Sequence, residues 1–338
     1  TFGGYFAVGM VILAEGAMDA NKAMFVVDAL GHPPAEPRDL ALRTVGGEHM
    51  DVFENSCLVS CDVSHKLPWI IMCSCYLDSP ATLPRLRLLL SRLVLPMCQR
   101  YSSTTDFQDS RGKLCVIIFI GNFVRSSDMG HEGSIIEKQC RLFGELGACL
   151  CSPDFDLGCR SLASLVEFVF IPGPGDCVLG PSSVLPRSKL LEKITKPLAD
   201  RVRARQGTSL TCTTSPTRFR YGSGKELVVH RDDILGRLQQ VSAHVPPKSS
   251  KDTLANATAD LAKTILDQGH LAPATSQNQP ILWNYDHTLR LYPPPSTICL
   301  GDDTAPAFDT TYAMTRVFNP GNFTTEGTFV LFHPDSGE

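Results

Sequence analysis

The sequence has 338 residues, of which 43% are hydrophobic and 20% are charged, and its formal net charge at pH 7 is −4. This length and composition predict one large globular domain or two smaller ones, with enough apolar material for a sizeable core. No polybasic tract occurs, so the composition does not favour direct nucleic-acid binding. No run of eighteen apolar residues occurs either, so no membrane-spanning helix is predicted.

The sequence contains thirteen cysteines, which is a high number for its length. Several lie inside apolar runs, among them Cys73 and Cys75 in WIIMCSCYL and Cys115 in LCVIIFI. Because free cysteine packs like a small hydrophobic residue, we expect reduced, buried thiols. Cys57 and Cys61 have no partner pair at zinc-ligand spacing, so no structural zinc site is predicted.

The first 40 residues are expected to form a small β unit. In YFAVGMVILAEGAMDANKAMFVVDAL (5–30), short apolar runs predict two or three strands joined by a turn near Asp19–Lys22. Three prolines follow in GHPPAEPRD (31–39). Because proline disrupts the interior of helices and sheets, this stretch predicts a boundary.

After this boundary, buried strands alternate with helices. Continuous apolar runs predict strands over 67–77, 113–123 and 164–176, and helical spacing of apolar residues predicts helices over 83–98 and 134–151. Apolar residues follow one another along these strands rather than alternating with polar residues. The sequence therefore predicts a sheet covered on both faces, in the α/β class.

The rest of the chain is predicted to continue with mixed elements. Proline, glycine and aspartate residues mark where several of them start or stop. The predicted elements are a helix over 188–206 limited by Pro197, a hairpin within 217–235 that leads into a helix starting at Asp232 or Asp233, a helix over 251–271 that stops at Gly269, a strand within 290–303, and a pair of closing strands within 315–334.

Polar residues that could carry chemistry follow three of the predicted strands. The carboxyl ends of strands in an α/β sheet form the crevice in which ligands bind. Two later stretches have a similar composition, so we expect all five polar stretches to converge at this edge of the sheet. They are CSCYLD (73–78), GNFVRSSD (121–128), GPGD (173–176), QGHL (268–271) and LGDD (300–303).

The spacing of these strand ends resembles that of the calcineurin-like metallophosphoesterases. In that family three successive strands end in Asp-x-His, in Gly-Asp-x-x-Asp and in Gly-Asn-His-Asp/Glu, and a later loop supplies Gly-His-x-His. These carboxylates and imidazoles bind two divalent metal ions, which favour such ligands. The resemblance implies a calcineurin-like domain over residues 41–338.

Most ligand positions of that pattern hold other residue types in this sequence. An asparagine cannot bridge two cations as a carboxylate does, and an arginine would repel them. Too few ligands remain for a di-metal centre, so we predict an inactive framework with no catalytic residue, no metal and no cofactor. The positions carried over from the resemblance are Ser74, Tyr76, Asn122, Arg125, Pro174, Asp176, His270 and Asp302.

One alternative is a divergent but active metallophosphoesterase that uses Asp176, His270 and Asp302. Each of these residues also has a structural interpretation. Asp176 would stabilise its own turn, His270 would interact with the dipole of a helix end, and Asp302 with Asp303 would form a solvated turn.

The whole chain also resembles the B subunit of the eukaryotic replicative DNA polymerases, and it is most similar to that of DNA polymerase epsilon. The matching stretches run in order from about residue 10 to residue 332, and only their combination is specific. They include FIGNFVRSS, FVFIPGPGD, VLPRSKL, TILDQGHLAP, YDHTLRLYPPPSTICLGDD and FNPGNF.

This resemblance implies a fold of the α/β class, or α+β overall, in which part of an OB-fold barrel (1–40) precedes the inactive domain. It implies a non-catalytic subunit that binds the zinc-bearing C-terminal region of the catalytic subunit. Further implied partners are other polymerase epsilon subunits and replicative helicase components. The implied location is the nucleus, and DNA is expected to be contacted at most indirectly.

Two further expectations concern the basic residues. Arg218, Arg220 and Arg231 lie on the matching stretches and are expected to form internal salt bridges or partner contacts rather than to act in catalysis. In the OB portion Lys22 is the only cation before Arg38, which disfavours single-strand binding there.

Overall fold

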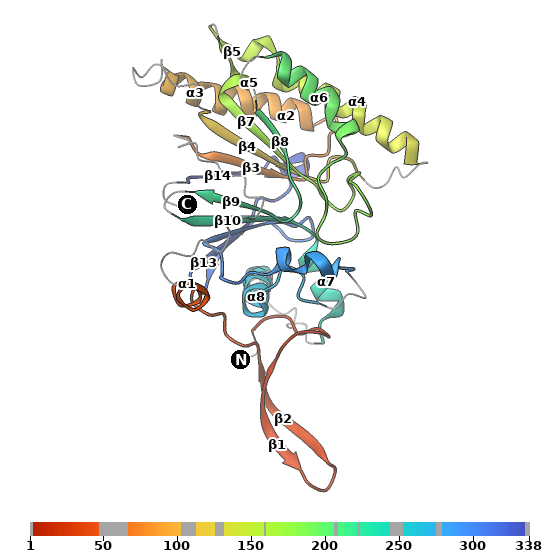
Figure 1. The fold of residues 1–338 in the computed structure, drawn as a ribbon, viewed down its shortest axis with the longest axis vertical. Helices are drawn as coiled ribbons and strands as arrows, with labels where there is room; N and C mark the ends of the chain where they lie inside the picture. Colours follow the sequence, from red (N-terminus) through yellow and green to blue (C-terminus); the bar gives the residue numbers. More distant parts are fainter. Residues whose placement is uncertain are drawn as a thin grey trace.

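The described residues of a computed structural model form four stacked layers, with helices outside two central sheets (Figure 1). A β-hairpin extends from one end of this body. No helix in the described residues is long and apolar enough to cross a membrane. The description covers residues 3–46, 67–102, 113–125, 132–158, 160–205, 209–221, 224–243, 253–274 and 279–334.

The first sheet has five strands among the described residues, in the order β14-β3-β4-β7-β8. All of its neighbouring strands are parallel except the β14–β3 pair. The predicted strands over 67–77, 113–123 and 164–176 are confirmed as β3, β4 and β7. The bounds are β3 (Trp69–Cys73), β4 (Cys115–Ile120), β7 (Val166–Ile171), β8 (Ser209–Cys212) and β14 (Val330–Phe332).

Helices cover the outer face of the first sheet (Figure 1). The predicted helix over 83–98 is present as two α-helices joined by the π-helical turn η1 (Leu90–Val94). The covering helices are α2 (Thr82–Leu89), α3 (Leu95–Ser102), α4 (Glu132–Leu150) and α6 (Glu192–Ala204).

The second described sheet follows the order β12-β13-β11-β10-β9, and α7 and α8 cover its outer face. The predicted hairpin, helix start and closing Gly269 are confirmed, and Gly269 has φ of +59°. The bounds are β9 (Thr217–Tyr221), β10 (Lys225–Arg231), α7 (Ile234–Val241), α8 (Thr253–Gln268), β11 (Thr297–Gly301), β12 (Phe308–Tyr312) and β13 (Thr315–Asn319).

Strand β4 shows why the core strands are apolar at every position. Successive side chains of a strand point to opposite faces. Ile117 and Phe119 pack in the cluster beneath the helices, whereas Val116 and Ile118 pack between the two sheets. Both faces of the strand are therefore buried, as the continuous apolar pattern predicts.

Helix α6 does not stop at Pro197, which lies inside it, so the prediction that this proline limits the helix is wrong. A proline within a helix leaves the carbonyl four residues earlier without its backbone donor. That carbonyl belongs to Lys193, and the Cys140 thiol of α4 donates a hydrogen bond to it, with an S···O distance of 3.4 Å. Packing against α4 thus satisfies the group that proline leaves unpaired.

Two further differences concern the later strands. The closing strands β13 and β14 are present but lie in different sheets rather than as a pair. Strands β8 and β12 were not predicted. The other short elements are α1 (Arg38–Gly46), η4 (Pro153–Phe155), β5 (Asp156–Leu157), β6 (Arg160–Ser161), α5 (Leu162–Leu165), η5 (Trp283–Leu289) and α9 (Phe323–Glu326).

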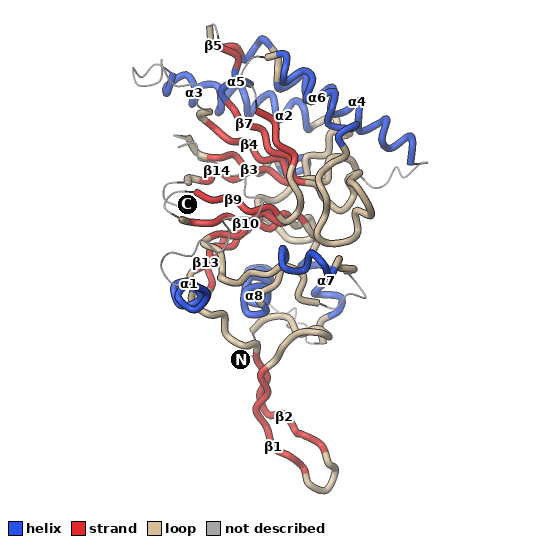
Figure 2. The backbone as a smooth tube through the Cα atoms, in the orientation of Figure 1, coloured by secondary structure: helices blue, strands red, loops and turns tan. Residues whose placement is uncertain are grey.

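The N-terminal hairpin consists of β1 (Leu13–Asp19) and β2 (Met24–Gly31) and projects away from the four layers (Figure 2). This confirms two strands with a turn beyond Asp19. Segments on both sides of the hairpin are tied to α8: the Tyr5 N–H donates to Thr264 Oγ1 at 2.8 Å, and the Ala35 N–H donates to Asp267 Oδ1 at 3.0 Å. The OB-fold assignment of residues 1–40 stays a prediction.

The expectation of buried thiols holds for six of the ten described cysteines, and the other four are partly buried. Cys73, Cys75 and Cys115 are buried and free, and burial raises the pKa of each thiol. Buried thiols of this kind are unreactive packing residues. Cys57 and Cys61 lie outside the described residues.

Candidate functional site

Four of the five predicted stretches meet where the strands of the two sheets end. Asn122, after β4, accepts a hydrogen bond through Oδ1 from the Gly175 N–H at 2.7 Å. Ser74, after β3, donates through its hydroxyl to Asp303, after β11. The hydrogen-bonded residues at this edge are here called the strand-end cluster: Ser74, Tyr76, Asn122, Asp176, Arg231, Asp233 and Asp303.

Arg231, the last residue of β10, lies at the centre of this cluster and is fully buried. Its Nε donates to the Gly121 carbonyl at 2.6 Å and its Nη1 to the Gly301 carbonyl at 3.0 Å. It also pairs with Asp233 at 2.6 Å and with Asp303 at 2.9 Å. One guanidinium thereby joins the ends of strands from both sheets, and the prediction of internal salt bridges for Arg231 is confirmed.

The charge of Arg231 is strongly favoured at this position. Burial opposes the charged form, but the carboxylates of Asp233 and Asp303 raise the pKa of Arg231 above its ordinary value. Arg218 forms the second expected internal pair, with Glu226 at 3.1 Å.

Asp303 is surrounded by hydrogen-bond donors. The Tyr76 hydroxyl donates to its carboxylate at 2.5 Å, and burial, reinforced by this hydrogen bond, raises the pKa of Tyr76. Asn322 Nδ2 donates at 3.3 Å. With the Ser74 hydroxyl and Arg231 added, four donors from three chain segments converge on one carboxylate, which is therefore committed to protein partners.

Asp176 forms a second, separate part of the cluster. Its Oδ1 accepts from the Phe123 N–H and its Oδ2 from the Gly173 N–H, both at 2.8 Å. The side chain is 2% exposed, and burial raises its pKa to about 6 against the effect of these two donors. The Gly121 backbone packs directly against this carboxylate, because a Cβ at Gly121 would lie only 2.0 Å from Asp176 Oδ2. This carboxylate joins the turns that follow β4 and β7.

Two more of the carried-over positions lie at the rim of the cluster. Pro174 is partly exposed in the turn after β7. The Arg125 guanidinium carbon lies 5.5 Å from the centre of the Tyr76 ring, and its backbone N–H points at the Asp78 carboxylate. A cation over an aromatic face is stabilising and places positive charge at the mouth of the cluster.

Asp302 and His270 do not join the cluster, which corrects the expectation that all five stretches converge. Asp302 Oδ2 accepts from the Leu235 N–H at 2.7 Å, at the first turn of α7, and Oδ1 accepts from the Thr304 N–H at 2.8 Å. His270 follows the end of α8 and pairs through Nε2 with Asp286 at 3.1 Å. The residues of the alternative hydrolase therefore belong to three separate networks.

Asp303 joins the cluster, although the sequence analysis carried Asp302 over from the resemblance as the candidate site position. Successive residues leaving a strand point to opposite sides, so only one of the pair can face the cluster. Arg231 was identified as a salt-bridge residue, but its place at the centre was not predicted.

The arrangement has the chemistry of a structural ionic network. In the described part of the chain, no group of three or more His, Cys, Asp and Glu side chains is placed to hold a metal ion. A divalent ion placed near Asp233 and Asp303 would be repelled by the fixed charge of Arg231 between them.

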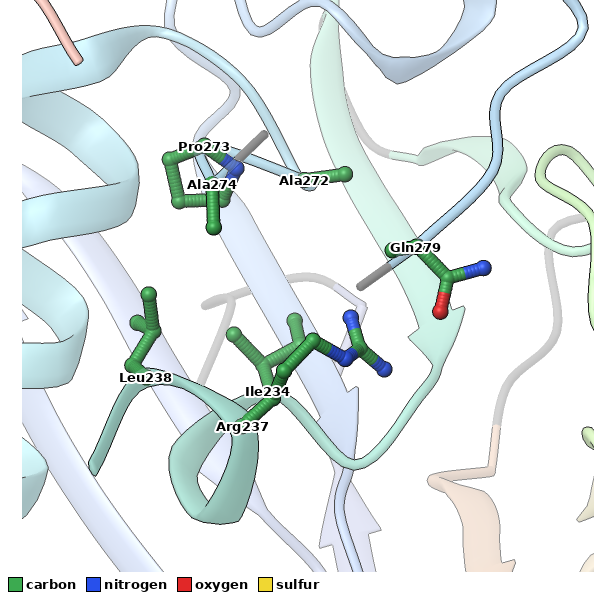
Figure 3. Close-up of a pocket in the computed structure, with 7 residues that line it drawn as sticks. All are labelled: Ile234, Arg237, Leu238, Ala272, Pro273, Ala274 and Gln279. Carbon is green, nitrogen blue, oxygen red and sulfur yellow. The ribbon is translucent and has the colours of Figure 1, made fainter. Parts of the chain in front are cut away.

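A pocket lies outside the cluster, between α7 and the segment that follows α8 (Figure 3). Its cavity volume is about 10 Å³, which is enough for one water molecule. Sites for drug-sized ligands measure on the order of 300 Å³ or more, so this pocket is too small for a substrate of that size. The lining residues are Ile234, Arg237, Leu238, Ala272, Pro273, Ala274 and Gln279.

A protein-family model matches the part of the chain that contains this cluster. The family model for the B subunit of DNA polymerases alpha and epsilon matches residues 69–310, from the first residue of β3 into β12. The chain belongs to this B-subunit family. All seven residues of the strand-end cluster lie inside the matched region, whereas the N-terminal hairpin lies outside it.

Individual relatives agree with the predicted resemblance to the polymerase epsilon B subunit. The B subunit of DNA polymerase epsilon from Arabidopsis thaliana is 31% identical over 99% of this chain and 59% of its own length. The Saccharomyces cerevisiae protein of the same description is 28% identical over 96% of this chain and 51% of its own length. DNA polymerase epsilon subunit 2 of Homo sapiens is 28% identical over 98% of this chain and 57% of its own length. The chain thus spans between half and three fifths of these relatives.

The chain was matched to a solved structure, that of TT1561 of Thermus thermophilus. The match includes 80% of this chain and 96% of the TT1561 chain. Its sequence identity is 12% and its TM-score 0.36. We assign no fold from this similarity. The mixed α/β class predicted from the sequence is confirmed by the two sheets and their covering helices.

Proposed function

We propose that this chain forms part of a non-catalytic subunit of the DNA polymerase epsilon holoenzyme, which acts as a scaffold in nuclear DNA replication. Membership of the B-subunit family and the names of the relatives support this. In this proposal the scaffold binds the zinc-bearing C-terminal region of the polymerase catalytic subunit.

The observation that carries the proposal is the Arg231 network. Its guanidinium and the donors around Asp303 occupy the strand ends at which a hydrolase of this layout would need free metal ligands. We propose that residues 41–338 are a calcineurin-like domain whose chemistry has been replaced by these structural contacts. Ser74, Tyr76, Asn122, Arg125 and Pro174 supply no carboxylate or imidazole there.

The N-terminal hairpin has a separate place in the proposal. Apolar side chains on both of its faces are half exposed, for example Phe25 and Val26 at 48% each. Adjacent strand residues point to opposite faces, so a covering partner must reach both. An isolated hairpin is marginal in water, which supports residues 1–40 as part of a larger OB-fold barrel.

The remaining proposed properties follow from the same role. The scaffold would contact other polymerase epsilon subunits and components of the replicative helicase, and DNA at most indirectly. No cofactor is needed for such a scaffold, because protein contacts alone perform the task.

Co-purification tests the proposed function. The full-length protein that contains this chain, co-expressed with the C-terminal region of the catalytic subunit, is expected to elute with it as one complex in size-exclusion chromatography. A fragment of the catalytic subunit that ends before this region serves as the negative control. Separate elution of the two proteins, both folded, would refute the scaffold role.

A further inference from the structure

The N-terminal hairpin is joined to the body of the protein at a small hydrogen-bonded junction beside α8 (Figure 2). Gln268, the last residue of α8, lies at its centre. Its Oε1 accepts from the Val11 N–H at 2.9 Å, and its Nε2 donates to the Val11 carbonyl at 2.8 Å. Val11 lies shortly before β1. Gln268 therefore helps to fix the direction in which the hairpin, with its exposed apolar side chains, leaves the body.

His32 contacts the same amide from the other strand of the hairpin, because it directly follows β2. Its Nδ1 is 2.9 Å from Gln268 Nε2, and its ring stacks on the ring of Phe6 with the centroids 4.2 Å apart. The His32 side chain is 6% exposed. Both ends of the hairpin are thus tied to one side-chain amide, the first through Val11 and the second through His32.

The Val11 backbone determines which protonation state of His32 fits this junction. The Val11 N–H is a donor, so the Gln268 atom that faces it must be the oxygen, and the amide nitrogen then faces the Val11 carbonyl. An amide nitrogen donates and does not accept, so the His32 Nδ1 beside it must be an acceptor. A protonated imidazole carries a hydrogen on both nitrogens. Only neutral His32 therefore fits the observed arrangement.

The surroundings of His32 also favour the neutral ring. Burial lowers the pKa of His32, while the charge of Asp267 opposes this effect and that of Lys263 adds to it. Asp267 and Lys263 pair with each other on α8. Three further titratable side chains lie around the junction on the adjacent segments, and each is already hydrogen-bonded: Tyr5, Asp260 and Tyr312.

We propose that Val11, His32 and Gln268 form a proton-sensitive latch that holds the N-terminal hairpin in a fixed direction on α8. Protonation of His32 places an Nδ1 hydrogen against the hydrogens of the Gln268 amide. The amide must then leave His32 or turn over, and turning over breaks both of its bonds to Val11. The latched state thus binds fewer protons than the released state. The latch is closed above the ordinary histidine pKa of about 6.5 and weakens as the pH falls below it.

Hydrogen exchange of the full-length protein, followed by mass spectrometry, tests the latch. The reporter is the peptide that contains Val11, whose N–H is bonded to Gln268. After correction for the intrinsic effect of pH on exchange, its protection is expected to fall severalfold between about pH 7.5 and about pH 5, a range in which carboxylates of model peptides stay mostly charged. Constant protection of β4 verifies that the body stays folded. Equal protection of the Val11 peptide across this range would overturn the proposal.

Two substitutions assign the effect to its residues. The His32 Nε2 has no hydrogen-bond partner in the described part of the chain, so His32→Phe keeps the stack on Phe6 and loses only the bond from Gln268. The pH dependence is expected to vanish in this variant. Gln268→Glu presents a carboxylate to His32, which pairs with it best when protonated, so protection at Val11 is expected to rise on acidification.

Asn256→Asp is the matched control for this change from amide to acid. Asn256 is exposed on the same helix, and the variant is expected to follow the unmodified protein at every pH. If His32→Phe loses protection on acidification as the unmodified protein does, another group takes up the proton and the latch is refuted. A fall of protection in Gln268→Glu equal to that of Asn256→Asp would refute the role of Gln268.

Discussion

Replacement of Arg231 by methionine is expected to lower the free energy of unfolding by about 3 kcal/mol, because removing one member of a buried ionic network leaves its partners uncompensated. Methionine keeps much of the side-chain volume but donates no hydrogen bond. The Gly121 and Gly301 carbonyls lose their donors, and Asp233 and Asp303 lose their counter-charge. Partial exposure of the two carboxylates, at 36% and 20%, permits hydration and limits the loss. Chemical denaturation measures it.

Arg141→Met is the matched control for this substitution. Arg141 pairs with Glu145 on α4, but its side chain is 67% exposed. Exposed ion pairs of this kind contribute about 0.5 kcal/mol or less. Equal stability changes in the two variants would mean that the Arg231 network does not stabilise the strand ends.

Replacement of Gly121 by alanine is expected to destabilise the protein by about 3 kcal/mol or more, because the new methyl group has no space. It would lie 2.0 Å from Asp176 Oδ2 and 2.7 Å from the Gly173 backbone nitrogen. Neither neighbour can move easily, since the Asp176 carboxylate is held by the Phe123 and Gly173 N–H groups. Thermal and chemical unfolding of the variant measure the effect.

Gly144→Ala provides the comparison for this second substitution. Gly144 lies within α4, and the nearest atom to an added Cβ is Pro197 Cβ at 3.6 Å, an ordinary contact. Because alanine favours a helix over glycine by about 1 kcal/mol, this variant is expected to be neutral or more stable. A Gly121→Ala protein as stable as Gly144→Ala would contradict the described packing of the β4 and β7 turns.

Elements with a strong local signal could be predicted from the sequence. Strands β3 and β4 are apolar at every position, and β7 at every position except Glu167, because both faces of these strands are buried. By contrast, β12 (FDTTY) is a largely polar edge strand, and β8 is four residues long. Their pairing depends on neighbouring strands that local sequence does not reveal.

Tertiary contacts explain the remaining differences. Helix α6 continues through Pro197 because a cysteine on another helix satisfies the free carbonyl. His270 was expected near the strand ends, but α8 packs on the outer face of the second sheet, so its C-terminus reaches Arg290 instead. Which of Asp302 and Asp303 faces the cluster depends on strand register. Such contacts connect residues far apart in the chain, and no local pattern contains them.

The central claim is that the strand-end cluster is a structural ionic network and not a metal centre. Elemental analysis of the full-length protein, equilibrated with excess Mn²⁺ and then freed of unbound ions by gel filtration, tests this claim most directly. Our account predicts manganese well below one ion per chain, unchanged in an Asp303→Asn variant. Two manganese ions per chain, lost in that variant, would contradict it.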